Sequence, residues 1–136
     1  MRFPKIIGLL TFILLGVIMN GCQSVDHEND IPGTTIAQIN TDELASIMQG
    51  TNDNTIFIDV REPYEFEEGH INDMINMPLS SLEDNYEELP LDSEIVIICR
   101  SGNRSMKAAN MLKKYGYTKL INVQGGISNW NGKLVK

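Results

Sequence analysis

Short apolar segments alternate with segments of helical periodicity along most of this chain, and this alternation restricts its fold more than any other feature. The two clearest apolar segments are 55–60 (TIFIDV) and 94–98 (EIVII), both rich in β-branched residues. Continuous apolar runs of this kind are typical of strands that are buried on both faces of a sheet. Because strands that alternate with helices form βαβ units, we predict an α/β fold with a mainly parallel sheet and helices on both faces.

Weaker patterns complete the alternation. Each expected helix has a capping residue at its start or apolar residues at helical spacing. The first begins at Asn40 or Thr41, the second at Ser80 or Ser81, and the third directly after the polar turn 100–105. The remaining strand candidates are 36–39, 74–77 and 120–123. The alternation therefore predicts one small domain over residues 36–136.

The first 21 residues have the organisation of a signal peptide. Two basic residues are followed by an apolar run over 6–19 and then by Gly21 and Cys22. The apolar run is shorter than the ~20 residues of a membrane-spanning helix. The sequence MNGC resembles a bacterial lipoprotein box, so we predict cleavage before Cys22 and acylation of that cysteine. Plain secretion and an uncleaved anchor stay open, because the two residues before Gly21 depart from the usual box.

Residues 22–35 are polar and acidic and are broken by Pro32 and Gly33, which predicts a flexible tether between the lipid anchor and the domain. The predicted mature chain carries 9 basic and 18 acidic residues, a net charge of −9, because the signal peptide holds two of the eleven basic residues and no acidic one. Such a charge repels nucleic acid. We therefore expect an extracytoplasmic protein, held at the bacterial cell membrane by its lipid, with no nucleic-acid partner.

Acylation of Cys22 leaves Cys99 as the sole free thiol, so no internal disulfide can form. Cys99 directly follows the strand candidate 94–98. In parallel α/β sheets, ligands bind beyond the carboxyl ends of the strands. A free cysteine in such a place is commonly just a small buried hydrophobic residue, so the residues that follow it decide between structure and chemistry.

The segment after Cys99 is small, polar and cationic, and it leads directly into a predicted helix. A helix N-terminus exposes unpaired backbone N–H groups, and a glycine-containing turn lets further amides converge on one point. Such a site and the nearby arginines stabilise a thiolate relative to the thiol. We therefore expect Cys99 to be partly ionised near neutral pH, above an anion-binding loop made of Arg100, Ser101, Gly102, Asn103, Arg104 and Ser105.

The spacing of the loop discriminates between small anions. Ser105 occupies the position, six residues after Cys99, where cysteine-dependent phosphatases place an arginine, and Arg104 lies one residue earlier. The loop is thus tighter than a phosphate loop, which favours a smaller group such as a sulfur atom on Cys99. A cysteine phosphatase or an arsenate reductase is the less favoured alternative, the second also because the chain offers no resolving cysteine.

Several motifs, in order along the chain, resemble those of the single-domain rhodaneses, a family of sulfurtransferases. CRSGNRS over 99–105 is similar to their active-site loop, and 59–71 matches their D-V-R, E-[FY], G-H-[IL] pattern. The segments 76–78 and 125–130 resemble the N-[IV]-P and G-G…W motifs that follow. The resemblance covers 36–130 and implies a rhodanese-like three-layer fold with a central, mainly parallel, five-stranded sheet.

The resemblance also implies an activity. The Cys99 thiolate takes a sulfane sulfur from thiosulfate or a persulfide, and the resulting persulfide gives the sulfur to cyanide or a thiol. Arg100 and Arg104 are expected to attract the anionic donor, and no metal or organic cofactor is implied. A membrane-tethered sulfur carrier or protein-interaction module with little turnover stays open, with its protein partner unknown.

Residues outside the loop receive supporting roles. We expect Arg61 and Glu65 to form an ion pair and Asp59 to accept hydrogen bonds from nearby backbone or from Arg61. We expect His70 to pack and to donate a hydrogen bond rather than to act as a base, because transfer from a preformed thiolate needs no separate proton acceptor. The acidic run 65–68 is expected to be a solvated face.

Overall fold

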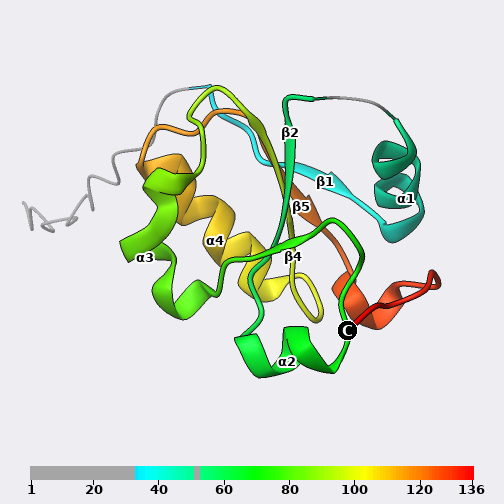
Figure 1. The fold of residues 1–136 in the computed structure, drawn as a ribbon. Coiled ribbons are helices and arrows are strands. Elements are labelled where there is room, and N and C mark those ends of the chain that lie inside the picture. The colour runs from blue at the N-terminus through cyan, green and yellow to red at the C-terminus, as the bar shows by residue number, and fades with distance from the viewer. Residues whose placement is uncertain (1–32, 51–52) are drawn as a thin grey trace, which may run out of the picture.

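The computed structural model describes residues 33–50 and 53–136 (Figure 1). The predicted signal peptide 1–21, the predicted lipidation site Cys22 and most of the predicted tether 22–35 lie outside the described residues. Among the residues of these two ranges, no helix is both long and apolar enough to cross a membrane.

Five parallel strands form one sheet at the centre of the domain (Figure 1). They lie in the order β1-β5-β4-β2-β3, and each pair of neighbours is parallel. The predicted five-stranded sheet is confirmed, and every strand candidate is found with its ends within one residue of the expected position. The strands are β1 (Ala37–Ile39), β2 (Thr55–Asp59), β3 (Ile75–Asn76), β4 (Glu94–Ile98) and β5 (Leu120–Val123).

Helices cover both faces of the sheet, as predicted. α1 (Thr41–Gln49) lies on one face, and α3 (Leu82–Asn85) and α4 (Asn103–Lys114) lie together on the other (Figure 1). α2 (Pro63–Glu68) follows β2 and lies at the end of the sheet where the chain also leaves β4 (Figure 1). This end, between α2 and the first turn of α4, is where a parallel α/β sheet offers a site.

β4 is the strand that joins the two hydrophobic cores. Ile95 and Ile97 are fully buried in the core on the α4 side, whereas Val96 and Ile98 are fully buried in the core on the α1 side. Successive side chains of a strand point to opposite faces, so the next residue, Cys99, belongs to the core on the α4 side. The apolar run EIVII thus directs the cysteine towards the helix that follows it.

Asn40 is the residue that caps α1, which decides between the two predicted caps. Its side-chain oxygen accepts hydrogen bonds from the backbone N–H groups of Asp42 and Glu43, both over 2.9 Å. The Glu43 carboxylate accepts in return from the Asn40 N–H over 2.8 Å, which completes a capping box.

The predicted acidic helix after Ser80 or Ser81 is instead a series of short helical segments. A 3-10 helix, η1 (Leu79–Ser81), precedes α3, and a second, η2 (Tyr86–Glu88), follows it. The side chain of Ser81 makes no capping hydrogen bond to the first turn of α3. The start of α3 therefore lacks the side-chain cap that the sequence predicts. After this series, the hydroxyl oxygen of Tyr117 lies 2.7 Å from the carbonyl oxygens of both Tyr86 and Leu89, which share its single proton.

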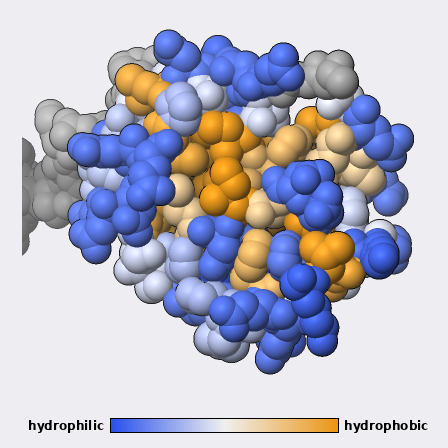
Figure 2. Space-filling view, in the orientation of Figure 1, coloured by the Kyte–Doolittle hydropathy of each residue, from blue (hydrophilic) through white to orange (hydrophobic). Residues whose placement is uncertain are grey.

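β2 is less buried than its apolar sequence predicts. β3 pairs only with Ile58 and Asp59, so the first part of β2 has no strand beside it on that edge within the described chain. Figure 2 shows hydrophobic residues gathered in the middle of the face on which β2 is seen in Figure 1, with hydrophilic residues around them. Burial on both faces therefore begins at Ile58, and the residues from Thr55 to Phe57 are half-buried.

Candidate functional site

Cys99 lies where the chain leaves the carboxyl end of β4 and turns into α4. It is 1% exposed. The turn is possible because Gly102 has a φ of 104°, in the left-handed region that glycine adopts without strain, and α4 begins at the next residue, Asn103. The predicted order of strand, cysteine, glycine turn and helix is confirmed, but the helix begins earlier than predicted, so that the last three residues of the predicted turn 100–105 form the first turn of α4.

The sulfur of Cys99 is surrounded by hydrogen-bond donors. The backbone N–H of Gly102 donates to Sγ over 3.1 Å, and the hydroxyl oxygen of Ser105 lies 3.3 Å from Sγ. Burial raises the pKa of the Cys99 thiol, but the Ser105 hydroxyl and the backbone N–H groups of Ser105, Gly102 and Ser101 lower it by more in total. The pKa therefore lies below its ordinary value, which favours the nucleophilic thiolate.

A second glycine turn supports this loop. Gly126 has a φ of 57°, and a Cβ at this position would collide with the backbone carbonyl oxygens of Cys99 and Arg100. The backbone N–H of Ile127 donates to the Cys99 carbonyl over 2.9 Å, and that of Ser128 donates to the Arg100 carbonyl over 3.0 Å. The G-G motif thus lets two backbone segments approach closely and fixes the start of the loop.

Arg104 is held by Glu65 of α2. Nη1 of Arg104 lies 2.6 Å from Oε2 of Glu65, and Nη2 lies 2.8 Å from Oε1. The hydrogen bond from Arg104 is the largest cause that lowers the pKa of Glu65 from 4.5 to about 2. The pair ties α2 to the first turn of α4. The Glu65 carboxylate also neutralises the Arg104 guanidinium, so Arg104 is less able to attract an anionic donor than the sequence predicts.

The predicted ion pair between Arg61 and Glu65 is wrong. Nη2 of Arg61 instead lies 2.7 Å from Oδ2 of Asp59, and both side chains are buried. The guanidinium also donates to the backbone carbonyls of Glu65, over 3.2 Å, and Gly69, over 2.9 Å. Asp59 and Arg61 are two residues apart in extended chain and so share a face, whereas the Glu65 carboxylate is turned towards Arg104. The expected role of Asp59 is confirmed.

His70 has a packing role, as predicted. Its ring stacks on that of Phe66 with the centroids 3.7 Å apart, and Nδ1 lies 2.9 Å from the Phe66 carbonyl oxygen. Because a carbonyl can only accept, Nδ1 is the donor. The backbone of His70 pairs with Val135 through hydrogen bonds of 2.9 and 2.8 Å, so His70 holds the C-terminal segment against the end of α2.

A cavity of about 350 Å³, here called the entrance cavity, opens beside the loop. Four residues of the cavity wall were not among the predicted site residues: Tyr64, Glu68, Ile127 and Ser128. Glu68 is exposed, as its expected place on a solvated face implies. Tyr64 and Glu68 are four residues apart on α2 and so share one helix face, which is the signal that could have shown this pair. In the described ranges no group of side chains suited to hold a metal ion was found. The cavity is lined by Arg61, Tyr64, Glu65, Glu68, Arg100, Ile127 and Ser128.

Fold and site together define an α/β domain with an activated cysteine between a central strand and a helix. The family model of the rhodanese-like domain matches residues 40–133, and the chain belongs to that family. A crystal structure of a rhodanese-related protein from Thermoplasma volcanium is 32% identical, with a TM-score of 0.64, and covers 73% of this chain and 97% of that one.

Several curated relatives carry names that concern sulfur, and two of them match most of this chain. The putative sulfur carrier protein YrkF of Bacillus subtilis is 42% identical over 117 residues, which are 83% of this chain and 58% of that protein. A sulfurtransferase of Allochromatium vinosum is 34% identical over 95 residues, which are 70% of this chain and 88% of that protein. The match thus covers about three fifths of the length of YrkF. It covers a similar share, 61%, of a second relative from Bacillus subtilis. At the level of the family, these relatives support a role in sulfur transfer.

Proposed function

We propose that this chain is a sulfurtransferase that carries a sulfane sulfur on Cys99. One observation carries the proposal: the Cys99 sulfur lies 3.1 Å from the Gly102 N–H group and 3.3 Å from the Ser105 hydroxyl, at the carboxyl end of the central strand. Membership of the rhodanese-like family and the sulfurtransferase among the relatives support it.

The proposed reaction has two halves. First, the Cys99 thiolate attacks the outer sulfur of the donor; a new S–S bond forms, and the donor's own bond to that sulfur breaks. The leaving group, sulfite from thiosulfate or a thiolate from a persulfide, takes the bonding electron pair. Second, cyanide or a thiolate attacks the outer sulfur of the Cys99 persulfide, and Cys99 departs as a thiolate.

The loop stabilises the charge that both halves place near the same atom. The N–H of Gly102 and the hydroxyl of Ser105 are already directed at Sγ before the reaction begins. Such fixed donors need no reorganisation when the charge develops. Arg100 is exposed, has no ion-pair partner in the described part of the chain, and is the loop cation that can attract a donor. These steps need neither a metal nor an organic cofactor.

Turnover of thiosulfate and cyanide tests the proposal. The assay uses the full chain with Cys22→Ser, in which Cys99 is the only thiol, and measures the thiocyanate released. We expect release by this protein and none above background after the further change Cys99→Ser. Equal release by the two proteins would sink the proposal.

The relative named as a putative sulfur carrier favours a second candidate, a carrier that hands its sulfur to a protein and turns over slowly with small acceptors. A single-turnover measurement separates the two. A carrier loads one sulfur on Cys99 quickly and releases it slowly to cyanide, whereas an enzyme does both at comparable rates.

We also propose that the domain works outside the cytoplasm, on a tether over 22–35 that a lipid on Cys22 fixes to the membrane. The sequence of the first 22 residues supports this location. Metabolic labelling with a fatty acid should mark the wild-type chain and not the Cys22→Ser chain. Labelling of both chains, or of neither, would contradict the proposed anchor.

A further inference from the structure

The entrance cavity holds two ionised side chains that are already neutralised. Arg61 forms an ion pair with Asp59, and Glu65 forms one with Arg104. Each pair contributes no net charge to the cavity, so neither is available to balance the charge of a ligand.

The two other ionised side chains that line the cavity have no such partner. Arg100 and Glu68 are both exposed, and neither makes an ion pair within the residues that the structure describes. The cavity therefore offers one cation and one anion, on opposite elements: Arg100 from the loop and Glu68 from α2.

The cavity is next to the nucleophile. Arg100 follows Cys99 directly, and consecutive Cα atoms are about 3.8 Å apart. The backbone N–H of Ile127, another residue of the cavity wall, donates to the Cys99 carbonyl over 2.9 Å. Two residues of the cavity wall, Arg100 and Ile127, are therefore joined directly to the backbone of Cys99.

The charges of the cavity discriminate between donors. Thiosulfate is a dianion, and a cavity with one free cation and one free anion gives it no net attraction. The whole chain, with a formal net charge of −7, adds a repulsive field. A zwitterion carries one charge of each sign, so it can pair with both Arg100 and Glu68 and meets no net electrostatic repulsion from the cavity. A volume of about 350 Å³ is near the lower end for ligand sites, which suits a small molecule.

We propose that the entrance cavity selects a small zwitterionic persulfide, an amino acid or short peptide that bears an –S–SH group, in preference to thiosulfate. Its carboxylate pairs with Arg100 and its ammonium group pairs with Glu68. This inference rests on the proposed function and specifies the donor for the same cysteine.

The chemistry of the step is balanced without a further reactant. The Cys99 thiolate attacks the outer sulfur of the donor R–S–S–H and forms a Cys99–S–S–H persulfide. The S–S bond of the donor breaks, and its electron pair stays on the inner sulfur, which leaves as R–S⁻. Tyr64, which is 65% exposed at the rim of the cavity, offers an aromatic surface to the carbon skeleton of R.

A panel of donors tests the inference on the full chain with Cys22→Ser. The donors are cysteine persulfide, its N-acetyl derivative without the ammonium group, cysteamine persulfide without the carboxylate, and thiosulfate. The readout is kcat/KM for the loading of sulfur onto Cys99. We expect cysteine persulfide to load fastest, because it alone satisfies both charges of the cavity.

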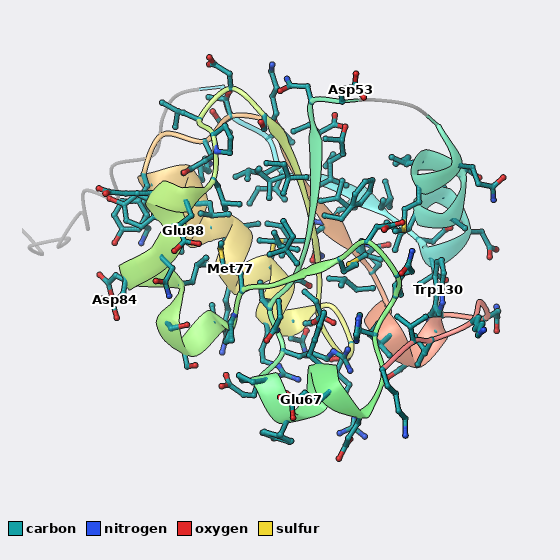
Figure 3. All side chains as sticks on the ribbon, viewed as in Figure 1. Asp53, Glu67, Met77, Asp84, Glu88 and Trp130 are labelled. Atoms are coloured by element: carbon teal, nitrogen blue, oxygen red, sulfur yellow. The ribbon has the colours of Figure 1, made fainter. Side chains whose placement is uncertain are left out.

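Two variants assign the charges to their residues. Glu68→Gln should lower the preference for cysteine persulfide over its N-acetyl derivative about fivefold, equivalent to ~1 kcal/mol. Arg100→Gln should lower the preference over cysteamine persulfide by a similar factor. Glu67→Gln is the matched control, because Glu67 is an exposed neighbour on α2 that does not line the cavity (Figure 3). It should leave both preferences unchanged.

The outcomes separate this inference from the proposed function. Equal loading by the three persulfides, faster loading by thiosulfate, or equal preferences in the Glu68→Gln and Glu67→Gln proteins would overturn the inference while Cys99 still accepts sulfur. Failure of every donor to load Cys99 would overturn the proposed function, and the inference with it.

Discussion

Replacing Glu65 with glutamine tests the ion pair that ties α2 to the catalytic loop. The change removes the negative charge opposite Arg104 but keeps the size of the side chain. It also keeps an oxygen that can accept the hydrogen bond which the Glu62 backbone N–H now makes over 3.0 Å. The loss of stability in Glu65→Gln therefore measures the ion pair rather than the start of α2.

The pKa of Glu65 sets an upper limit for the effect. The fall of the pKa from 4.5 to about 2 corresponds to ~3 kcal/mol if all of it stabilises the fold. The Arg104 side chain is 31% exposed, so water screens the pair and the expected loss is nearer ~1–2 kcal/mol. A loss of this size is measurable by urea denaturation.

The pH dependence gives the sign of the effect. The pKa of Glu65 is lower in the folded state, so its contribution is fully present above about pH 4.5 and disappears as the pH falls towards 2. We therefore expect the free energies of unfolding of wild type and Glu65→Gln to differ at pH 7 and to converge between pH 4.5 and 2. Equal stabilities at pH 7, or a difference that does not change with pH, would refute the reasoning. Glu67→Gln is the exposed control on the same helix.

Three further substitutions test other contacts of the site and its supports. Ser105→Ala removes the hydroxyl that lies 3.3 Å from Sγ, so the pKa of the Cys99 thiol should rise. Alkylation of Cys99 should then be slower at pH 7, whereas its rate well above the pKa should stay the same. An unchanged pH profile of alkylation would contradict this. Gly126→Ala places a Cβ against the Cys99 and Arg100 carbonyls at a φ of 57° and should cost about 2 kcal/mol or more. Gly50→Ala is the control and should cost less, because its φ is −79° and a Cβ there meets only the Ile47 carbonyl oxygen, at 3.3 Å. Tyr117→Phe removes the hydroxyl from the Leu89 carbonyl, whereas the Tyr86 carbonyl keeps the backbone N–H of Leu89 over 3.0 Å. The change should cost ~1–3 kcal/mol in urea denaturation; full stability would show that water replaces the hydroxyl.

The sheet and the loop could be predicted because their signals are local. A run such as EIVII specifies a strand by its own composition, and the glycine and small polar residues after Cys99 specify a tight turn before a helix. Cys99 and the turn at Gly102 are therefore where the sequence places them, whereas α4 begins at Asn103, inside the predicted turn 100–105.

The ion pairs could not be predicted, because each charged side chain has several partners within reach along the chain. Glu65 is four residues from Arg61, a spacing that favours contact on a helix, but Arg61 precedes α2 and pairs backwards with Asp59. The actual partner of Glu65 is Arg104, 39 residues away. Only the packing of α2 beside the first turn of α4 brings them together. The entrance cavity likewise depends on the packing of α2, the loop and the segment 127–128, and only the shared helix face of Tyr64 and Glu68 is visible in the sequence.

The mass of the intact protein after exposure to a sulfur donor tests the central claim most directly. The full chain with Cys22→Ser is incubated with cysteine persulfide or thiosulfate, and excess donor is then removed. The mass of the intact protein is measured by mass spectrometry before and after cyanide is added. We expect a gain of one sulfur atom that cyanide removes, and no gain after the further change Cys99→Ser. No gain with any donor, or an equal gain without Cys99, would contradict a sulfur-carrying cysteine at this site.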